Sequence, residues 1–163
     1  MSTGFDVAPW AVRHRLTVTT ESRDTIDFVD LTDRISGIVK EAGLNDGLVV
    51  IFTRHTTTGI LINEHEPLLL EDLRRFFADL APGERAYAHD DLGRRTVNLG
   101  PNERRNGHSH CRAAFLRTSE TLPVVDGALA LGRWQRVFLV DFDSGQRREL
   151  TLTLLGCSGA ERA

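Results

Sequence analysis

The chain begins with a segment in which apolar and polar side chains alternate. Within residues 10–20, Val12, His14, Leu16 and Val18 fall on one side of an extended backbone, and arginine and threonine side chains fall on the other. A period of two residues is typical of a half-buried strand. His14 lies on the apolar side, which favours a core or interface histidine over a ligand.

The period then changes to that of a helix. Asp30 or Thr32 is placed to cap the first helix, and Gly43 is placed to end it. Pro67 is suited to the first turn of a second helix, which we expect to end at the Ala-Pro-Gly-Glu sequence that starts at residue 81. The two apolar stripes are Leu31, Ile35, Ile38, Val39 and Ala42, and Leu69, Leu73, Phe76, Phe77 and Leu80.

The remaining apolar runs predict strands. Residues 47–53 form a β-branched run suited to a central strand, and residues 59–64 predict another. We expect the C-terminal third to be entirely strand, over residues 111–119, 121–125, 127–131, 134–143 and 149–156. The run 134–143 is apolar on both faces, which predicts a cover on each side by a second sheet or a neighbouring subunit. Its hairpin partner, 149–156, alternates with leucines inward. The fold class is therefore α+β, with antiparallel sheets and two helices.

Composition limits the class of protein. A chain of 163 residues indicates one domain, 1–163, and a net charge of −3 gives no sign of nucleic-acid binding. Cys111 and Cys157 lack a C-x-x-C spacing, which argues against a disulfide framework or a cysteine zinc site. We expect both cysteines to be small buried residues. No apolar run fits a signal peptide or a membrane span, so we expect a cytoplasmic protein without a membrane partner.

Histidines gather at the predicted edges of strands and loops. His55 follows a strand, His89 lies in the long polar segment 82–109, and His108 and His110 close that segment. At a strand entrance, an H-x-H spacing places both side chains on the same face. Neutral imidazoles bind divalent metals, so the set predicts a zinc or magnesium site. Ordinary histidines in a surface loop remain the alternative.

Other polar residues offer chemistry with weaker signals. The His-Thr-Thr-Thr-Gly sequence of residues 55–59 could cradle a phosphate, although a tight turn between strands is the favoured interpretation. Glu64, beside Asn63, is a candidate general base or magnesium ligand. Asp143 is expected to serve its turn. The arginine pairs are interpreted as solvated loops: Arg94-Arg95, Arg104-Arg105 and Arg147-Arg148.

Several motifs together resemble a known family. They are HTTTGILINE, HDD, NGHSH and PVVDGALALGRWQRVFLVDFDSGQRRELTLTLLG, and the likeness covers residues 12–156. The sequence is similar to the YjbQ-like family, described as secondary thiamine-phosphate synthases. The resemblance implies an α+β sandwich that assembles as a homotrimer.

The resemblance also implies a reaction. Hydroxymethylpyrimidine diphosphate would be joined to thiazole phosphate as a weak or secondary activity, with pyrophosphate released. The alternatives are a trimeric protein that binds a metal and a small phosphorylated metabolite without turnover, and a metal-dependent hydrolase. The implied roles are catalysis by Glu64, His89 and His110, metal binding by His55, His89 and His110, and substrate binding by Thr56, Thr57, Asn63, Asn106, Trp134 and Gln135.

Overall fold

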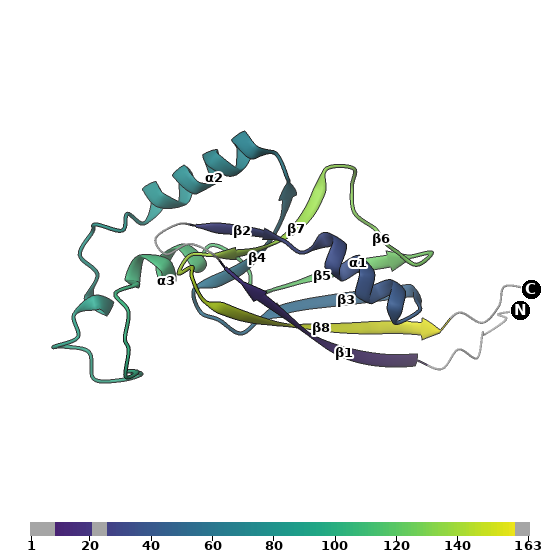
Figure 1. Ribbon diagram of the computed structural model, residues 1–163, viewed down its shortest axis with the longest axis horizontal. Helices are drawn as coiled ribbons and strands as arrows, with labels where there is room; N and C mark the ends of the chain where they lie inside the picture. The colour runs from purple at the N-terminus through teal and green to yellow at the C-terminus, as the bar shows by residue number, and fades with distance from the viewer. Residues whose placement is uncertain (1–8, 21–25, 159–163) are drawn as a thin grey trace, which may run out of the picture.

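A computed structural model describes residues 9–20 and 26–158. Its larger sheet is antiparallel and five-stranded, in the order β1-β8-β3-β5-β6 (Figure 1). The predicted central strand is the middle strand of this sheet, β3. The strands are β1 (Pro9–Thr19), β3 (Leu44–Thr53), β5 (Ser119–Val125), β6 (Ala128–Leu129) and β8 (Arg147–Ser158).

The smaller sheet is antiparallel and three-stranded, in the order β2-β7-β4. It contains β2 (Asp27–Asp30), β4 (Thr58–Glu64) and β7 (Gln135–Asp141). The predicted hairpin between residues 134–143 and 149–156 is wrong, because β7 pairs with β2 and β4 whereas β8 pairs with β1 and β3. The short turn after β7 therefore carries the chain from one sheet to the other.

Three α-helices accompany the sheets, where two were predicted. The helices α1 (Thr32–Glu41) and α2 (Pro67–Leu80) match the predicted positions. Asp30 accepts a hydrogen bond from the Thr32 N–H, and Gly43 follows α1 with a positive φ of 66°, as expected at a helix end. The third helix, α3 (Gly107–Ala113), stands where a strand was predicted to begin.

Two apolar clusters explain why β7 is buried on both faces. One face packs into the core shared with the five-stranded sheet and α1, and includes Val137 and Leu139. The other face packs against α2 and the end of α3, and includes Phe138 and Val140. The second cover of β7 is thus α2, which lies above the smaller sheet in Figure 1, and no neighbouring subunit is needed there.

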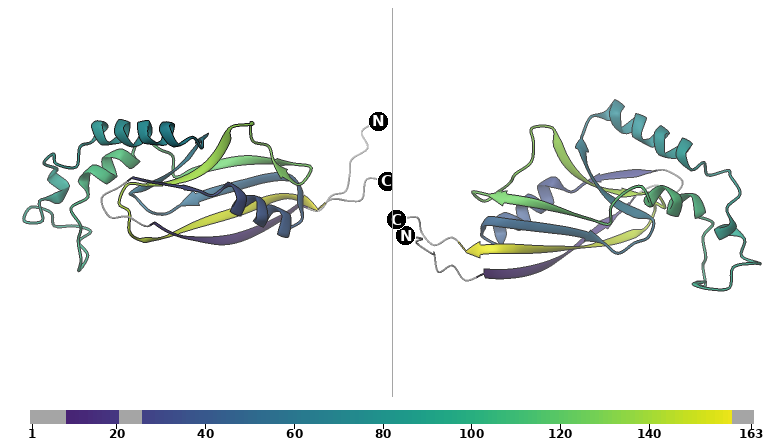
Figure 2. Two further views of the ribbon diagram at one scale, coloured as in Figure 1. Left: turned by 45° about the horizontal axis from the view of Figure 1, so that its top comes forward. Right: turned by 180° about the vertical axis from the view of Figure 1, so that it is seen from behind.

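The outer face of the five-stranded sheet is different. Leu48, Phe52 and Leu155 alternate with the core residues, and 41%, 39% and 39% of their surfaces are exposed. Seen from behind, no helix lies in front of β3 and β8 (Figure 2). This face therefore leaves three large apolar side chains partly exposed.

Smaller expectations are corrected as well. On α2, Leu70, which lies outside the predicted apolar stripe, is buried with Phe77, whereas Phe76 and Leu80 of that stripe are exposed. Cys111 is exposed rather than buried, because it lies on the outer side of a helix instead of in a strand. The side chain of Cys157 lies outside the described residues. None of the helices in residues 9–20 and 26–158 is long and apolar enough to cross a membrane.

Candidate functional site

The predicted site residues divide between the two ends of the three-stranded sheet. Thr58 pairs with Asp141 at one end, and Glu64 pairs with Gln135 at the other. The two pairs are six positions apart along β4, or about 20 Å at the usual rise of a strand. Four predicted residues therefore lie at the far end, apart from the turn that follows His55: Asn63, Glu64, Trp134 and Gln135.

His55 is separated from the other predicted metal ligands. Its Nε2 accepts a hydrogen bond of 3.0 Å from the Glu149 backbone N–H. The pKa of His55 is lowered, mainly by burial and secondly by the positive charge of the nearby Arg148. With Arg54, Arg147 and Glu149, His55 lines a surface depression of about 390 Å³. No three His, Cys, Asp or Glu side chains of the described residues are grouped so as to hold a metal ion. The zinc or magnesium ion stays a prediction.

His89 and His110 do come together. His89 lies in a short 3₁₀ turn (Ala88–Asp90), His110 lies on α3, and their ring centroids are 4.6 Å apart. Burial and the neighbouring His89 lower the pKa of His110, although Asp143 and Asp90 oppose the shift. The Nη1 of Arg95 lies 3.3 Å from Nε2 of His89. Because arginine only donates, this contact requires an unprotonated Nε2 and leaves the proton of a neutral His89 on Nδ1.

The helical conformation of α3 corrects the predicted H-x-H arrangement. Residues two apart on a helix are turned by about 200°, so His108 and His110 face different ways. The ring of His108 lies 6.2 Å from that of Tyr87 rather than beside His89. Gly107 allows the close approach that starts the helix: its N–H donates to Asp90, and a Cβ at this position would lie 2.5 Å from the Tyr87 Cβ.

Asn106 immediately precedes α3 and presents an unusual acceptor. Its Nδ2 donates a 3.0 Å hydrogen bond to Asp143, whose carboxylate also pairs with Arg104 at 3.0 Å. Because the carboxylate requires a donor, the orientation of the amide is determined. The Oδ1 of Asn106 is then buried without a hydrogen-bond partner. Buried acceptors in folded proteins nearly always have partners, so this oxygen is a marked exception.

A buried ion pair connects this loop to the His-Thr-Thr-Thr-Gly turn. Arg148 donates to both oxygens of Asp141 at 2.7 Å, and the two side chains are 5% and 0% exposed. The same guanidinium donates to the Thr57 hydroxyl and to the Asp143 carbonyl. The motifs predicted to form opposite walls are therefore joined through Arg148, which is not the solvated residue that we expected. Its signal in the sequence was its register, because Arg148 shares the inward face of β8 with Leu150, Leu152 and Leu154.

The rest of the threonine turn also makes internal contacts. The hydroxyl of Thr58 contacts the hydroxyl of Thr53 and donates a hydrogen bond to the carbonyl of His55. Gly59 packs against Leu116, since an added Cβ would lie 2.4 Å from the Leu116 Cβ. Thr56 is exposed. The predicted contacts of Thr56 and Thr57 with a phosphate stay predictions.

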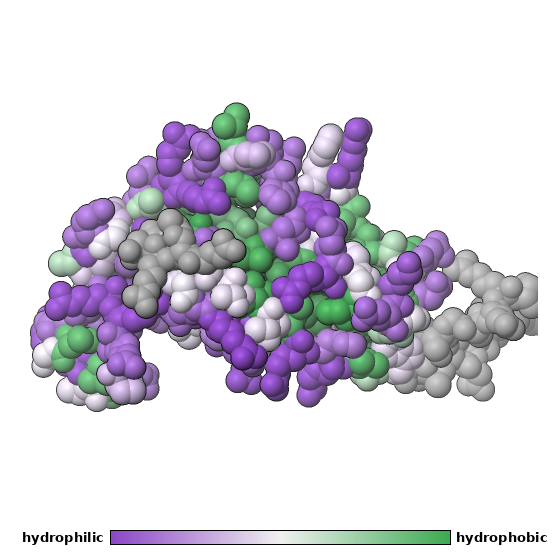
Figure 3. Space-filling model, viewed as in Figure 1, coloured by the Kyte–Doolittle hydropathy of each residue, from purple (hydrophilic) through white to green (hydrophobic). Residues whose placement is uncertain are grey.

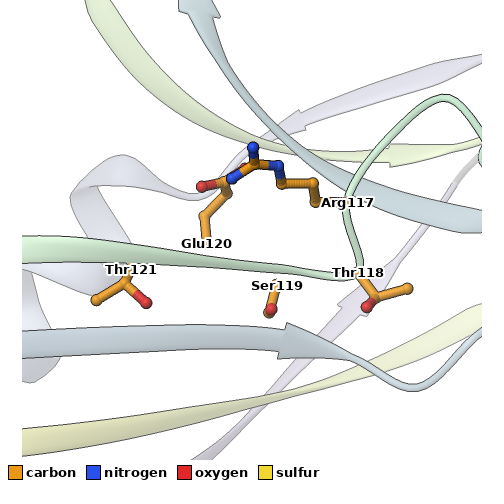
Figure 4. Close-up of a pocket in the computed structure, with 5 residues that line it drawn as sticks. All are labelled: Arg117, Thr118, Ser119, Glu120 and Thr121. Atoms are coloured by element: carbon orange, nitrogen blue, oxygen red, sulfur yellow. The ribbon is translucent and has the colours of Figure 1, made fainter.

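A larger depression, of about 550 Å³, lies at the start of β5 (Figure 4). Arg117 and Glu120 approach each other on one side of the strand, and Ser119 and Thr121 lie on the other. The Arg117–Glu120 pair, at 3.9 Å, already balances its charge. The polar groups near α3 therefore make the better candidate site, although the cavities there are smaller.

The comparisons with known proteins agree with this fold. The model of the family described as UPF0047 protein YjbQ-like matches residues 14–157. The chain belongs to this family. It is 36% identical to a UPF0047 protein of Archaeoglobus fulgidus, over 86% of this chain and 98% of the relative. The solved structure of a YbjQ-like protein from Sulfolobus solfataricus is 30% identical, with a TM-score of 0.79, and the likeness covers 91% of this chain and 99% of that one. An Aeropyrum pernix hypothetical protein gives 31% identity and a TM-score of 0.76, over 89% and 98% of the two chains.

These comparisons overturn the function predicted from the sequence. The relatives are named only as UPF0047 proteins, and the Sulfolobus solfataricus structure is described as a protein of unknown function. Neither the family description nor these names include a thiamine-phosphate synthase or a metal-dependent hydrolase. The prediction of a synthase with such alternatives was wrong because it rested on a description attached to the family resemblance, and not on chemistry carried by the residues.

Proposed function

We propose that the protein binds a small anionic metabolite that also carries a hydroxyl or amino group. The small phosphorylated metabolite expected from the sequence belongs to this class. The site consists of His89, His110, Asn106 and the neighbouring Arg95. In this proposal the two imidazoles supply donors to the anionic group, Arg95 positions His89 through its contact with Nε2, and the Asn106 Oδ1 accepts from the hydroxyl or amine.

The unpartnered Oδ1 of Asn106 is the observation that carries the proposal. Leaving a buried acceptor without a donor costs about 1 to 3 kcal/mol, which a ligand N–H or O–H would recover. Burial also keeps His110 uncharged near neutral pH, so it offers a donor on one nitrogen and an acceptor on the other. A purely anionic ligand would leave both acceptors unused, which is why the proposed class includes a donor group.

The loop that carries His89 is open to solvent, so a ligand could enter and leave the site there. Residues 82–106 project from one end of the molecule beyond α2 and α3 (Figure 1), and their surface is mostly hydrophilic with a small apolar patch (Figure 3). The exposed apolar residues of this segment include Val97 and Leu99, which are 68% and 48% exposed. Arg95 holds the loop together through its ion pair with Glu103 and its hydrogen bond to the Asn98 carbonyl.

Isothermal titration with phosphorylated and carboxylated alcohols and amines, and with their uncharged counterparts, tests the proposal. We expect binding only to the anionic members, and a loss of about tenfold in affinity in Asn106→Ala if one good hydrogen bond is removed. Asn102→Ala, an exposed asparagine of the same segment, is the matched control and should bind like the wild type. Binding that is equal in Asn106→Ala, His110→Asn and the wild type would refute this site.

We also propose that the chains assemble into a homotrimer through the outer face of the five-stranded sheet. The support is the exposed group of Leu48, Phe52 and Leu155, since contiguous apolar surface on a soluble protein commonly marks an interaction site. Sedimentation equilibrium should show trimers for the wild type and smaller species for Phe52→Glu. Phe76→Glu, which changes an exposed phenylalanine on α2, is the matched control and should leave the assembly unchanged.

A further inference from the structure

The second face of α3 lines a separate basic pocket. His108 and Arg112 are four residues apart and thus on the same side of the helix, turned away from His110. Together with the turn after β7 they enclose a cavity of about 280 Å³. Its other lining residues are Arg104, Arg105, Phe142, Asp143 and Ser144, and it is separate from the depression at His89.

Arg112 is the unusual member of this pocket. It is 7% exposed, and its Nε donates a 3.0 Å hydrogen bond to the Ala81 carbonyl. Among the described residues, no carboxylate lies within ion-pair distance of its guanidinium. Burial lowers its pKa, yet an arginine stays charged at neutral pH. Glu84 lies close enough to favour the charged form but makes no direct ion pair with Arg112. A buried charge without a direct partner is unfavourable, so an anion in the pocket would stabilise it.

The other two arginines reinforce this charge. Asp143 holds Arg104 in place at 3.0 Å, and the Ser144 carbonyl accepts weaker hydrogen bonds of 3.4 Å from the same guanidinium. Arg105 is exposed and has no hydrogen bond or ion pair within the described part of the chain. Three guanidinium groups therefore line the pocket against one carboxylate. Planar guanidinium groups match the oxygens of a phosphate particularly well.

We propose that this pocket binds a tetrahedral oxyanion, either free phosphate or the phosphate group of an ester. Arg112 forms the floor of the site, Arg104 is positioned by Asp143, and Arg105 closes over the anion from the solvent side. The site lies on a different face of α3 from the metabolite site at His89 and His110, although Asp143 contacts both Arg104 of this pocket and Asn106 of the other site. Loss of one therefore need not abolish the other.

Titration of the intact chain with inorganic phosphate, and in parallel with glycerol phosphate, tests this site. Each guanidinium contact to a phosphate is a charge-assisted hydrogen bond, so Arg105→Ala should weaken binding about tenfold. Arg112→Met, which removes the charge and retains much of the volume, should abolish binding. Arg75→Ala is the matched control, because Arg75 is an exposed arginine on α2 that lines neither this pocket nor the depression at His89.

The outcomes separate the two proposals. Weaker binding in Arg105→Ala with unchanged binding in Arg75→Ala and His110→Asn supports the arginine pocket, even if no metabolite binds at the histidines. The proposal is overturned if the wild type binds no phosphate, if Arg75→Ala and Arg105→Ala weaken binding equally, or if only His110→Asn does so. If Arg112→Met fails to fold, the exposed Arg105 decides the result. Tighter binding of glycerol phosphate than of inorganic phosphate would identify an ester as the preferred source.

Discussion

The two ends of β7 hold ion pairs in opposite surroundings. At the C-terminal end, Asp141 and Arg148 are almost completely enclosed and bonded at 2.7 Å. Near the N-terminal end, Arg136 is also 2.7 Å from Asp30, but its side chain is 34% exposed. Arg136 forms a second ion pair with Asp33 at the surface. His65 lies 2.9 Å from the same Asp30.

Similar distances thus accompany different roles. The inner pair joins β7 to β8, which belong to different sheets, and its arginine reaches both the threonine turn and the loop beside Asn106. The outer pair anchors the start of α1, because Asp30 also accepts from the Thr32 N–H. Water can solvate an outer charge whose partner is removed, but nothing replaces the partner of an inner charge. Substitution should therefore lower the stability of the protein more at the inner end than at the outer end.

Removal of the inner arginine should have the largest effect on stability. Arg148→Ala leaves the buried Asp141 without its counter-charge, which typically costs about 3 to 5 kcal/mol in the free energy of unfolding. Urea denaturation measures this loss. Arg147→Ala, one residue earlier and 69% exposed, is the control and should change stability by less than about 0.5 kcal/mol. Equal stability of the two variants would show that the ends of β7 do not differ as described.

The outer end should show a smaller effect that depends on pH. The pKa of Asp30 is about 2: burial favours the protonated form, but hydrogen bonds from Arg136, Thr32 and His65 together outweigh it. Asp30→Asn should therefore cost about 1.5 to 3 kcal/mol at pH 7, as expected for hydrogen bonds to a charged group.

The sign of the pH dependence follows from the lowered pKa. An unfolded aspartate titrates near pH 4, so the stabilisation by Asp30 is complete above about pH 4 and disappears as the pH falls towards about 2. The difference between wild type and Asp30→Asn should shrink over this interval in chemical denaturation curves. Asp33→Asn, 85% exposed, should show little of this change. A constant difference between pH 5 and pH 2.5 would contradict the assignment.

The sequence predicted the local elements of the fold better than their pairing. The α+β class and the positions of α1, α2 and β3 are confirmed. The two helices follow from apolar periods repeated over many residues, and β3 follows from a continuous β-branched run. The pairing of β7 with β8 failed because adjacency along the chain favours a hairpin, and neither strand encodes which sheet it joins. The third helix was missed because α3 spans only Gly107–Ala113, too short for a period to be distinguished from that of a strand.

The candidate site was predictable only in part. His89, His110 and Asn106 drew attention as polar residues in a long irregular segment, and the structure places them near one another. Arg148 was missed because the pair Arg147-Arg148 was interpreted as a solvated loop. Arg112 was missed because it fell within the predicted strand 111–119. Their importance comes from burial, which depends on segments far along the chain: Asp141 and Thr57 for Arg148, and the Ala81 carbonyl for Arg112.

The smallest expected effect distinguishes a structural role for Thr57 from the predicted phosphate contact. Thr57 is 5% exposed, and its hydroxyl accepts a 3.2 Å hydrogen bond from Arg148. Thr57→Val keeps the shape and removes this acceptor, so we expect a loss of about 1 kcal/mol in urea denaturation. Thr56→Val, exposed and adjacent, should change stability by less than about 0.5 kcal/mol.

Measurement of inorganic phosphate binding in the same two variants completes the test. If Thr57 only supports the inner end of β7, Thr57→Val loses stability but binds phosphate as tightly as the wild type. A direct contact with the anion would instead weaken binding in Thr57→Val, even after conditions are chosen so that the variant is fully folded. Since the hydroxyl can donate to an anion while accepting from Arg148, only the pair of measurements separates the roles. Unchanged stability together with weaker binding would show that Thr57 contacts the ligand and does not stabilise the end of β7.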